Sequence, residues 1–448
     1  MKKRIALCLL LMLCATLFAG TAPERFELQN HIPVYFKHNA ESELTAVYVV
    51  VRGGVQTLTP QTSGLEDAVF SLMRMGSKNR SFQELQDFCY RTQSEFFNYS
   101  IHEGSVLGMT CITDYFDDTF FCLEDAFLNP LFSEREYGLL MQEYRQNIQS
   151  IMNEPAQMLM YYASLMLYDG HPYAAKTSAT PESIENITLA AIKKHYRSLL
   201  DARRLCIVAS GNVSAEHLQE RLEKAFGSIP ALSSPLAESG VPSVSVEGEN
   251  AVLVHQSAAG TGYVLRAFAS PAVTDEDYAA ACITAAIYTD ILHNVVREKH
   301  GACYTPYSFV SSSAAPLGGD VLYRASNLTE FASFMDEAKE IMLSGMTISA
   351  RKPDGSYVLE PVSARLEGYI NSYITGKFVS QATVGGVTGR MCASLLQFGD
   401  ILRADGLIEK ARSLTPADVD RVFRAYWVDG ASRWFAVVGP DDEENVKF

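Results

Sequence analysis

Two side chains in the second half of the chain, Arg297 and Tyr304, have the chemistry to donate hydrogen bonds to a carbonyl group. They lie seven residues apart in the segment VVREKHGACY, at positions 295–304. A guanidinium and a phenol donate hydrogen bonds, and such donors suit a carbonyl oxygen and the oxyanion that develops when the carbonyl is attacked. A structural interpretation also stays open. Arg297 would then lie at a helix C-terminus, where the helix dipole favours a cation, and Tyr304 would pack at a sheet edge.

The elements that would position this pair can be inferred from the sequence around it. Apolar residues recur at every fourth position from Ile283 to Val295, which predicts a helix over residues 281–299. Gly301 suits the left-handed position after a helix. The residues that follow, CYTPYSFVSSS, are typical of a strand. The two donors would then flank a helix-to-strand corner.

A second segment of chemical interest is TSGLEDAVFSLMRMGS, residues 62–77. Apolar residues at i, i+4 and i+7 from Leu65 predict an amphipathic helix. Ser63 is followed three residues later by Glu66, which predicts a capping box at the helix start. Asp67 is expected to be a solvated or capping acid in the first turn.

The histidines of the chain do not gather into a metal-binding pattern. None of the nine forms an H-x-x-E-H, an H-E-x-x-H or a close pair: His31, His38, His102, His171, His195, His217, His255, His293 and His300. A catalytic zinc needs three protein ligands. No metal or other cofactor is therefore predicted to bind to this chain.

The chain carries an internal repeat of domain size. The segment ITLAAIKKHYRSLLDARRLCIVASGN (187–212) resembles LTPADVDRVFRAYWVDGASRWFAVVGP (414–440), with Thr188 and Thr415 at matching positions 227 residues apart. A repeat of this length indicates a duplicated domain, because the repeats of solenoids are much shorter.

Each half begins with strands, continues with long helices and ends with a helix and a strand. This order favours an α+β fold of two homologous domains, each a mostly antiparallel sheet with helices packed on one face. The expected N-terminal domain covers residues 24–228 and the C-terminal domain residues 250–448. Between them, residues 229–249 are rich in Pro, Ser and Gly and are predicted to be a linker.

The N-terminus predicts export. A basic MKKR, an apolar stretch too short for a comfortable membrane span and small residues near Ala19 and Gly20 are typical of a signal peptide over residues 1–20. A lipid anchor at Cys14 is not expected, since Leu13 before it is a poor match to the small residue of lipoprotein signals. The protein is expected to be periplasmic or associated with the cell envelope.

Net charge limits the expected binding partners, and cysteine content limits the expected disulfides. Removal of the three basic residues of the leader takes the formal charge of the chain from -15 to -18. An acidic chain repels phosphate backbones, so nucleic acid is not an expected partner. The seven cysteines after the leader are scattered and odd in number, which argues against a dense disulfide framework.

The duplicated halves and three short segments resemble the pitrilysin/insulinase family of zinc metallopeptidases, which includes the mitochondrial processing peptidases. The segments are the SGL…GS frame within residues 62–77, DGHPYAAKTSATPESIENIT (169–188) and VVREKHGACY (295–304). In active members of that family, the helix carries H-x-x-E-H: its two histidines bind zinc and its glutamate activates water.

The resemblance implies that this chain lacks the zinc motif. With the SGL and GS residues in register, Asp67, Phe70 and Ser71 stand where the family has His, Glu and His. Counting back from residues 153–155, Asn147 stands where a later helix of the family supplies a further glutamate ligand. Neither an aromatic ring nor a serine hydroxyl replaces these groups in a catalytic zinc site.

A different signature of the family is present. The run R-E-K-x-G-x-x-Y resembles the Arg/Tyr motif of the half that faces the zinc site across a closed chamber. The resemblance implies that Arg297 and Tyr304 bind the substrate backbone and orient the scissile carbonyl. Two departures stand against close analogy with the non-catalytic mitochondrial subunit: the glycines before the REK run are missing, and VGGVTG (384–389) is too short to be that subunit's glycine-rich loop.

The zinc motif is lost while the Arg/Tyr motif is present, and this combination favours two subunits with different roles. We expect a non-catalytic, zinc-less substrate-binding subunit of an exported heterodimeric peptidase, inactive alone. Arg297, Tyr304 and an exposed sheet edge would hold the peptide while a homologous, zinc-bearing partner cleaves it. The alternative is a non-enzymatic peptide-binding or scaffolding protein, with a homodimer as one form that it could take. Residual hydrolysis through an unrecognised metal site is the least favoured hypothesis.

Overall fold

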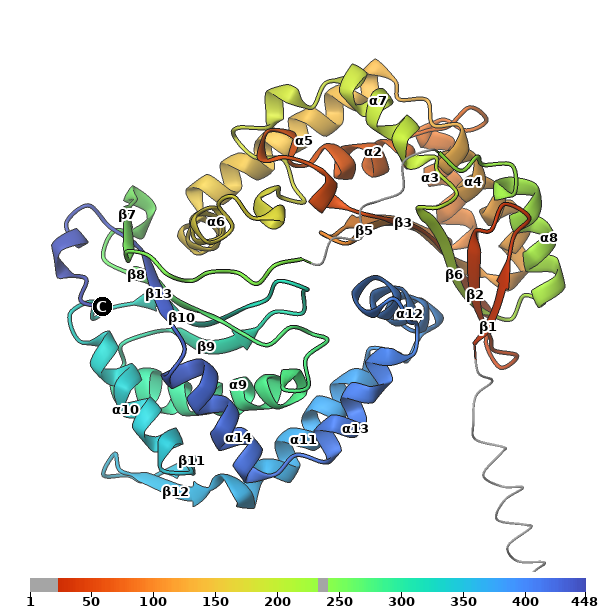
Figure 1. The fold of residues 1–448 in the computed structure, drawn as a ribbon. Coiled ribbons are helices and arrows are strands. Elements are labelled where there is room, and N and C mark those ends of the chain that lie inside the picture. Colours follow the sequence, from red (N-terminus) through yellow and green to blue (C-terminus); the bar gives the residue numbers. More distant parts are fainter. Residues whose placement is uncertain (1–22, 233–240) are drawn as a thin grey trace, which may run out of the picture.

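The computed structural model describes residues 23–232 and 241–448 of the chain. The predicted signal peptide (1–20) with Cys14 and the middle of the predicted linker lie outside the described residues. Two α+β halves follow one another along the chain, and each is built on its own sheet (Figure 1).

The first sheet has the strand order β1-β2-β6-β3-β5-β4. Its strands are β1 (Glu24–Glu27), β2 (Pro33–His38), β3 (Leu44–Arg52), β4 (Glu95–Ser100), β5 (Gly104–Ile112) and β6 (Leu205–Gly211). The strands are antiparallel except for the parallel pair β2 and β6. β4 is an outer strand, with a partner on one side.

The second sheet repeats this arrangement with the order β7-β13-β8-β10-β9. Its strands are β7 (Ala251–Val254), β8 (Gly262–Ala269), β9 (Thr305–Val310), β10 (Leu317–Ala325) and β13 (Ser432–Val438). The pair β7 and β13 is parallel, as β2 and β6 are. The order therefore matches β2-β6-β3-β5-β4, and the edge strand β9 corresponds to the edge strand β4. This correspondence agrees with the internal repeat seen in the sequence.

Helices of the first half cover one face of the first sheet (Figure 1). They are α2 (Leu65–Met73), α3 (Phe82–Thr92), α4 (Phe116–Leu128), α5 (Glu134–Asn153), α6 (Pro155–Leu167), α7 (Leu189–Leu199) and α8 (Ala215–Phe226). Alternate side chains of β3, including Val47, Val49 and Val51, point into this core. α6 is the exception, because it packs on the second sheet.

The second half has its own helices and a small hairpin. They are α9 (Tyr278–Leu292), α10 (Phe331–Leu343), α11 (Val362–Val379), α12 (Val384–Phe398), α13 (Gly406–Arg412) and α14 (Pro416–Phe423), with the hairpin strands β11 (Met346–Arg351) and β12 (Tyr357–Pro361). α9 continues into a π-helical segment, His293–Lys299, where the sequence predicted one helix over 281–299. By length and composition Tyr278–Lys299 could cross a membrane, but 67% of its apolar window is buried, as in a core helix.

One helix of each half packs on the sheet of the other half (Figure 1). α12 packs its Met391 and Leu395 against Tyr48 and Val50 on the second face of the first sheet. In return, α6 lies on the second sheet, where residues such as Leu159 join a cluster with strands β8 and β13. Each large side chain buried in this way stabilises the fold by roughly 1.5–3 kcal/mol.

The predicted fold class is confirmed: two homologous α+β halves, each with a mostly antiparallel sheet. The exchange of α6 and α12 adds a feature that the prediction did not contain. Helices cover both faces of each sheet, with one face covered from within the half and the other from the opposite half.

Candidate functional site

A cavity of about 590 Å³ lies beside α2 in the first half, lined also by α5 and by the edge strand β4. Three of the zinc-motif positions, Asp67, Ser71 and Asn147, line this cavity. Other polar and charged residues that line it are Arg74, Asn98, Glu143, Tyr144, Ser150 and Gln157. The folded chain therefore brings most of the degenerate motif positions together around one space.

The start of α2 differs from the prediction. Gly64, and not Ser63, is the N-cap, and it adopts a left-handed conformation with φ of 77°. A Cβ at Gly64 would lie 2.3 Å from the backbone nitrogen of Ala179, so the close approach of that loop requires glycine. The Ser63 hydroxyl accepts a hydrogen bond from the backbone of Lys176 at 2.9 Å instead of capping the helix. The predicted capping box is wrong.

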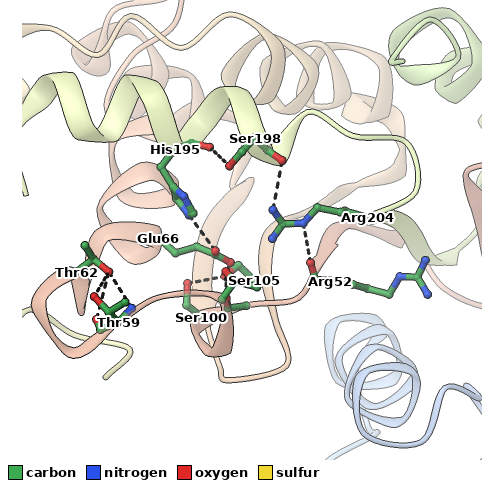
Figure 2. Close-up of polar contacts among 11 residues, drawn as sticks. Arg52, Thr59, Thr62, Glu66, Ser100, Ser105, His195, Ser198 and Arg204 are labelled. Carbon is green, nitrogen blue, oxygen red and sulfur yellow. Dashed lines mark hydrogen bonds and ion pairs between the residues drawn. The ribbon is translucent and has the colours of Figure 1, made fainter. Parts of the chain in front are cut away.

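Glu66, the other half of that predicted box, is fully buried. Ser105 Oγ donates a hydrogen bond of 2.5 Å to one carboxylate oxygen, and His195 Nε2 lies 3.1 Å from the other (Figure 2). These contacts join α2 to β5 and to α7. Buried carboxylates are stable only when paired and hydrogen-bonded in this way. Glu66 is thus a structural anchor that holds α2 in place.

Asp67 is half-buried in the cavity wall, not solvated as the sequence suggested. Tyr144 Oη donates a 2.5 Å hydrogen bond to Asp67 Oδ2, and Asn98 Nδ2 lies 3.5 Å from Oδ1. Burial raises the pKa of the Asp67 carboxyl, and the hydrogen bond from Tyr144 partly opposes this rise. Asp67 is therefore committed to internal contacts. The prediction failed because Tyr144 is 77 residues away in the chain.

Phe70 and Ser71 complete the altered motif. Phe70 is fully buried in the core of the first half and does not line the cavity. The Ser71 hydroxyl accepts a 3.3 Å hydrogen bond from Asn98. Within the described ranges, no group of three or more His, Cys, Asp and Glu side chains could hold a metal ion. The residues present do not fit a catalytic zinc, which requires three such ligands.

The helix-to-strand corner with Arg297 and Tyr304 lies in the second half of the chain. Arg297 belongs to the π-helical segment after α9, and Tyr304 directly precedes β9. Gly301 between them has φ of 59°, the left-handed conformation expected after a helix. The Arg297 guanidinium carbon lies 4.9 Å from the centre of the Tyr304 ring, within range of a cation–π contact. The fold therefore places the two donors side by side.

Few protein groups compete for these donors. Arg297 lies 3.3 Å from His293 Nε2 and 3.4 Å from a carboxylate oxygen of Glu298, both partly exposed. Tyr304 is 63% exposed, and its hydroxyl has no hydrogen-bond partner among the described residues. Exposed ion pairs of this kind contribute little to stability. The two side chains can therefore donate to a bound molecule.

Sequence reasoning missed three residues that organise the cavity: Arg74, Asn98 and Tyr144. Arg74 carried a usable signal, because it follows Asp67 by seven positions and so lies on the same helix face. Asn98 and Tyr144 carried none, since only the fold brings β4 and α5 against α2.

Comparison with known sequences identifies related peptidases. The Peptidase M16 inactive domain family matches residues 186–347. The probable mitochondrial-processing peptidase subunit beta of Schizosaccharomyces pombe is 26% identical over 231 residues, which cover 49% of each chain. The mitochondrial-processing peptidase subunit beta of Neurospora crassa is 20% identical over 421 residues, covering 91% of this chain and 83% of that protein. The match to the first relative thus spans about half of its length.

Solved structures share the fold over almost the whole chain. A peptidase M16 inactive domain from Pseudomonas fluorescens superposes with a TM-score of 0.77 at 15% identity, covering 94% of this chain and 98% of that one. The periplasmic protease PqqL from Escherichia coli has a TM-score of 0.73 at 15% identity, and covers 94% of this chain but only 46% of PqqL. The family model, the sequence matches and the shared fold make this chain similar to the M16 (pitrilysin/insulinase-type) peptidases, while its α2 lacks the H-x-x-E-H zinc motif.

Proposed function

We propose that this chain is the non-catalytic, substrate-binding subunit of an exported two-subunit peptidase. A homologous partner with a complete H-x-x-E-H motif would bind zinc and activate water. This chain would hold the peptide for cleavage. The observation that carries the proposal is the contrast within the molecule: α2 lacks the zinc ligands, whereas Arg297 and Tyr304 keep two adjacent, exposed donors.

The geometry of this pair supports a role in holding a carbonyl group. Tyr304 would donate its free hydroxyl to a substrate carbonyl oxygen, and the bond would strengthen as negative charge develops on that oxygen. Arg297 would donate from its planar guanidinium to a neighbouring carbonyl. Its stacking on the Tyr304 ring restricts both side chains before substrate arrives, which lowers the entropy cost of binding.

An extended peptide could be held along an edge of the second sheet. β9 is the outer strand of that sheet and begins at Thr305, directly after Tyr304. The backbone N–H and C=O groups on the free side of an edge strand can pair with an added strand. A peptide bound in this way would pass close to the Tyr304 hydroxyl.

The comparisons support a paired assembly outside the cytoplasm. Both mitochondrial relatives are named as subunits. The match covers 94% of this chain but 46% of the periplasmic protease PqqL, so PqqL is about twice as long as this chain. The basic and apolar N-terminus supports export. We therefore expect a zinc-bearing partner of similar size in the periplasm or cell envelope.

Purification from the native cells tests this proposal. The tagged chain would be isolated with any stable partner, the partner identified by mass spectrometry, and zinc and peptide hydrolysis measured for each chain and for the mixture. We expect zinc only in the partner and hydrolysis about a hundredfold faster in the mixture than in either chain, the range for adding oxyanion donors.

A different outcome would favour the non-enzymatic alternative. If the chain purifies alone or as a homodimer, binds peptides without cleaving them and adds no activity to any zinc-bearing homologue of the same cells, it is a peptide-binding or scaffolding protein. Stoichiometric zinc in the isolated chain would contradict both.

A further inference from the structure

The cavity beside α2 contains a cation whose hydrogen-bonding capacity is mostly unused. Arg74 follows α2 directly, and its guanidinium lines the cavity. Its one hydrogen bond within the described part of the chain runs from Nη1 to Asn98 Oδ1 at 3.0 Å. A guanidinium has five N–H donors. Most of these donors therefore remain open to the cavity.

Two other arginines of low exposure each donate to more than one protein acceptor. Arg266 donates to Asp320 at 3.1 Å and to the carbonyl of Trp427 at 2.6 Å. Arg204 donates to two backbone carbonyls (Figure 2). Arg74 has no such set of acceptors, although burial lowers its pKa and so opposes its charge. An anion bound in the cavity would offset this unfavourable desolvation.

The acids near Arg74 do not supply that anion by contact. Asp67 is hydrogen-bonded to Tyr144 and Asn98, and the described residues place no carboxylate oxygen within 4.0 Å of the Arg74 guanidinium. Glu143 is exposed on α5. The other polar lining is neutral and includes serine, asparagine and glutamine side chains. A fixed cation in this setting repels a divalent metal ion and attracts a carboxylate.

We propose that this cavity binds the free C-terminal carboxylate of a peptide, with Arg74 as its anchor. The inference rests on the proposed peptide-binding function and names the class of peptide end that the chain selects. A volume of about 590 Å³ is within the range of ligand pockets and admits the last residues of a chain. Asn98, which orients Arg74, belongs to the edge strand β4, along which the preceding residues of the peptide can extend.

A randomised decapeptide library, labelled at the N-terminus and made as C-terminal acids and as C-terminal amides, tests this inference. Binding to the purified chain is measured by fluorescence anisotropy. We expect the acids to bind about tenfold more tightly than the amides, as for one charge-assisted bidentate contact. Arg74→Gln should remove the difference by weakening only the acids, and Arg74→Lys should keep part of it.

Two controls separate this effect from net charge and from misfolding. Arg80→Gln removes the same charge from an arginine that lies over the Phe88 ring and does not line the cavity, and it should leave the acid preference intact. Melting temperatures of all variants are measured on the same preparations. A third library with an amidated C-terminal glutamate distinguishes a side-chain carboxylate from a terminal one.

The possible results distinguish the carboxylate site from the peptide-binding function. Equal binding of acids and amides, or equal loss of both in Arg74→Gln, overturns the carboxylate site while the proposed peptide-binding function stands. Binding of the amidated glutamate library as tight as that of the acids overturns the assignment to a chain terminus. No binding of any library overturns both this inference and the peptide-binding function.

Discussion

The two halves of the molecule contain equivalent corners with opposite character. In the first half, α2 lies next to the edge strand β4, and in the second half α9 leads to the matching edge strand β9. The side chains of the first corner bond one another: Asp67 to Tyr144, and Asn98 to Ser71 and Arg74. The second corner leaves its donors exposed.

Within this difference, Phe70 serves the fold and Tyr304 is available to a ligand. Phe70 is fully buried in the first corner, whereas Tyr304 is 63% exposed in the second. A fold gains free energy from burying an aromatic ring and gains little from an exposed phenol. The duplicated framework is therefore present in both halves, while the exposed, adjacent donors Arg297 and Tyr304 are found in the second.

Restoring the zinc motif should damage the first corner most. Phe70→Glu places a carboxylate without partners in an apolar core, and we expect it to lower the free energy of unfolding by at least about 4 kcal/mol. Ser71→His, at a half-buried cavity position, should change it by less than about 1 kcal/mol. Urea unfolding of each variant checks this difference.

The full replacement of Asp67, Phe70 and Ser71 by His, Glu and His should also bind no stoichiometric zinc, since Asn147 leaves the metal without its third protein ligand. Zinc bound at one equivalent would contradict the view that the altered motif cannot hold a metal, and a Phe70→Glu protein as stable as the parent chain would contradict the view that position 70 is committed to the core.

The anchoring of α2 by Glu66 is the next largest expected effect. Glu66→Ala removes the buried acceptor of the His195 ring and leaves the Ser105 hydroxyl with Ser100 as its neighbour (Figure 2). It should lower the free energy of unfolding by about 3 kcal/mol. Glu66→Gln keeps an acceptor oxygen and should lose less. Urea unfolding at neutral pH measures both. Equal and negligible losses would show that the pair does not hold α2.

Asp67 gives a pH-dependent effect of smaller size. Burial raises its pKa in the folded state above the unfolded value of 3.8, so the folded chain binds this proton more tightly than the unfolded chain does. The protonated Asp67 carboxyl favours the folded chain, and this contribution to the free energy of unfolding is lost as pH rises from 3.8 through the folded pKa. At neutral pH the buried, ionised carboxylate destabilises the folded chain. Asp67→Asn should therefore raise the melting temperature at pH 7.

The gain from Asp67→Asn should shrink as the pH falls toward 3.8. Melting curves of the Asp67→Asn variant and of the parent chain across this pH range measure the change. A gain that is constant with pH would mean that Asp67 acts through packing and not through its charge.

Arg297 should have the smallest effect on stability. Arg297→Ala removes a cation from a helix C-terminus and its contact with the Tyr304 ring, and should lower the free energy of unfolding by less than about 1 kcal/mol. Arg297→Lys keeps the charge but not the planar donors, so it should keep stability and still lose activity in the mixed complex. A large stability loss in both variants would favour the structural interpretation of this residue.

The sequence predicted the fold class well because hydrophobic periodicity and an internal repeat are local or directly visible signals. The corner of Arg297, Gly301 and Tyr304 was also visible, since helix end, left-handed glycine and strand start follow one another in the chain. The exchange of α6 and α12 was not visible. An apolar stripe says that a helix face is buried, but not which sheet covers it.

The polar contacts of α2 were predicted poorly for a related reason. Ser63 and Glu66 have the spacing of a capping box, but the approach of Ala179 to Gly64 and the buried partners of Glu66 override this local preference. Tertiary contacts determine both the N-cap of α2 and the partners of Glu66, and the residues that make these contacts lie far from α2 in the chain.

The central claim is that Tyr304 serves a partner's active site and not the fold. We predict that Tyr304→Phe lowers kcat/KM of the mixed complex by roughly ten- to a thousandfold, the range for removing one donor to a developing oxyanion, while the melting temperature is unchanged. Tyr307→Phe is the matched control, because it removes a phenol hydroxyl on β9 that bonds Tyr323 within the sheet. Unchanged turnover by the Tyr304→Phe complex, with or without a lower melting temperature, would contradict the account.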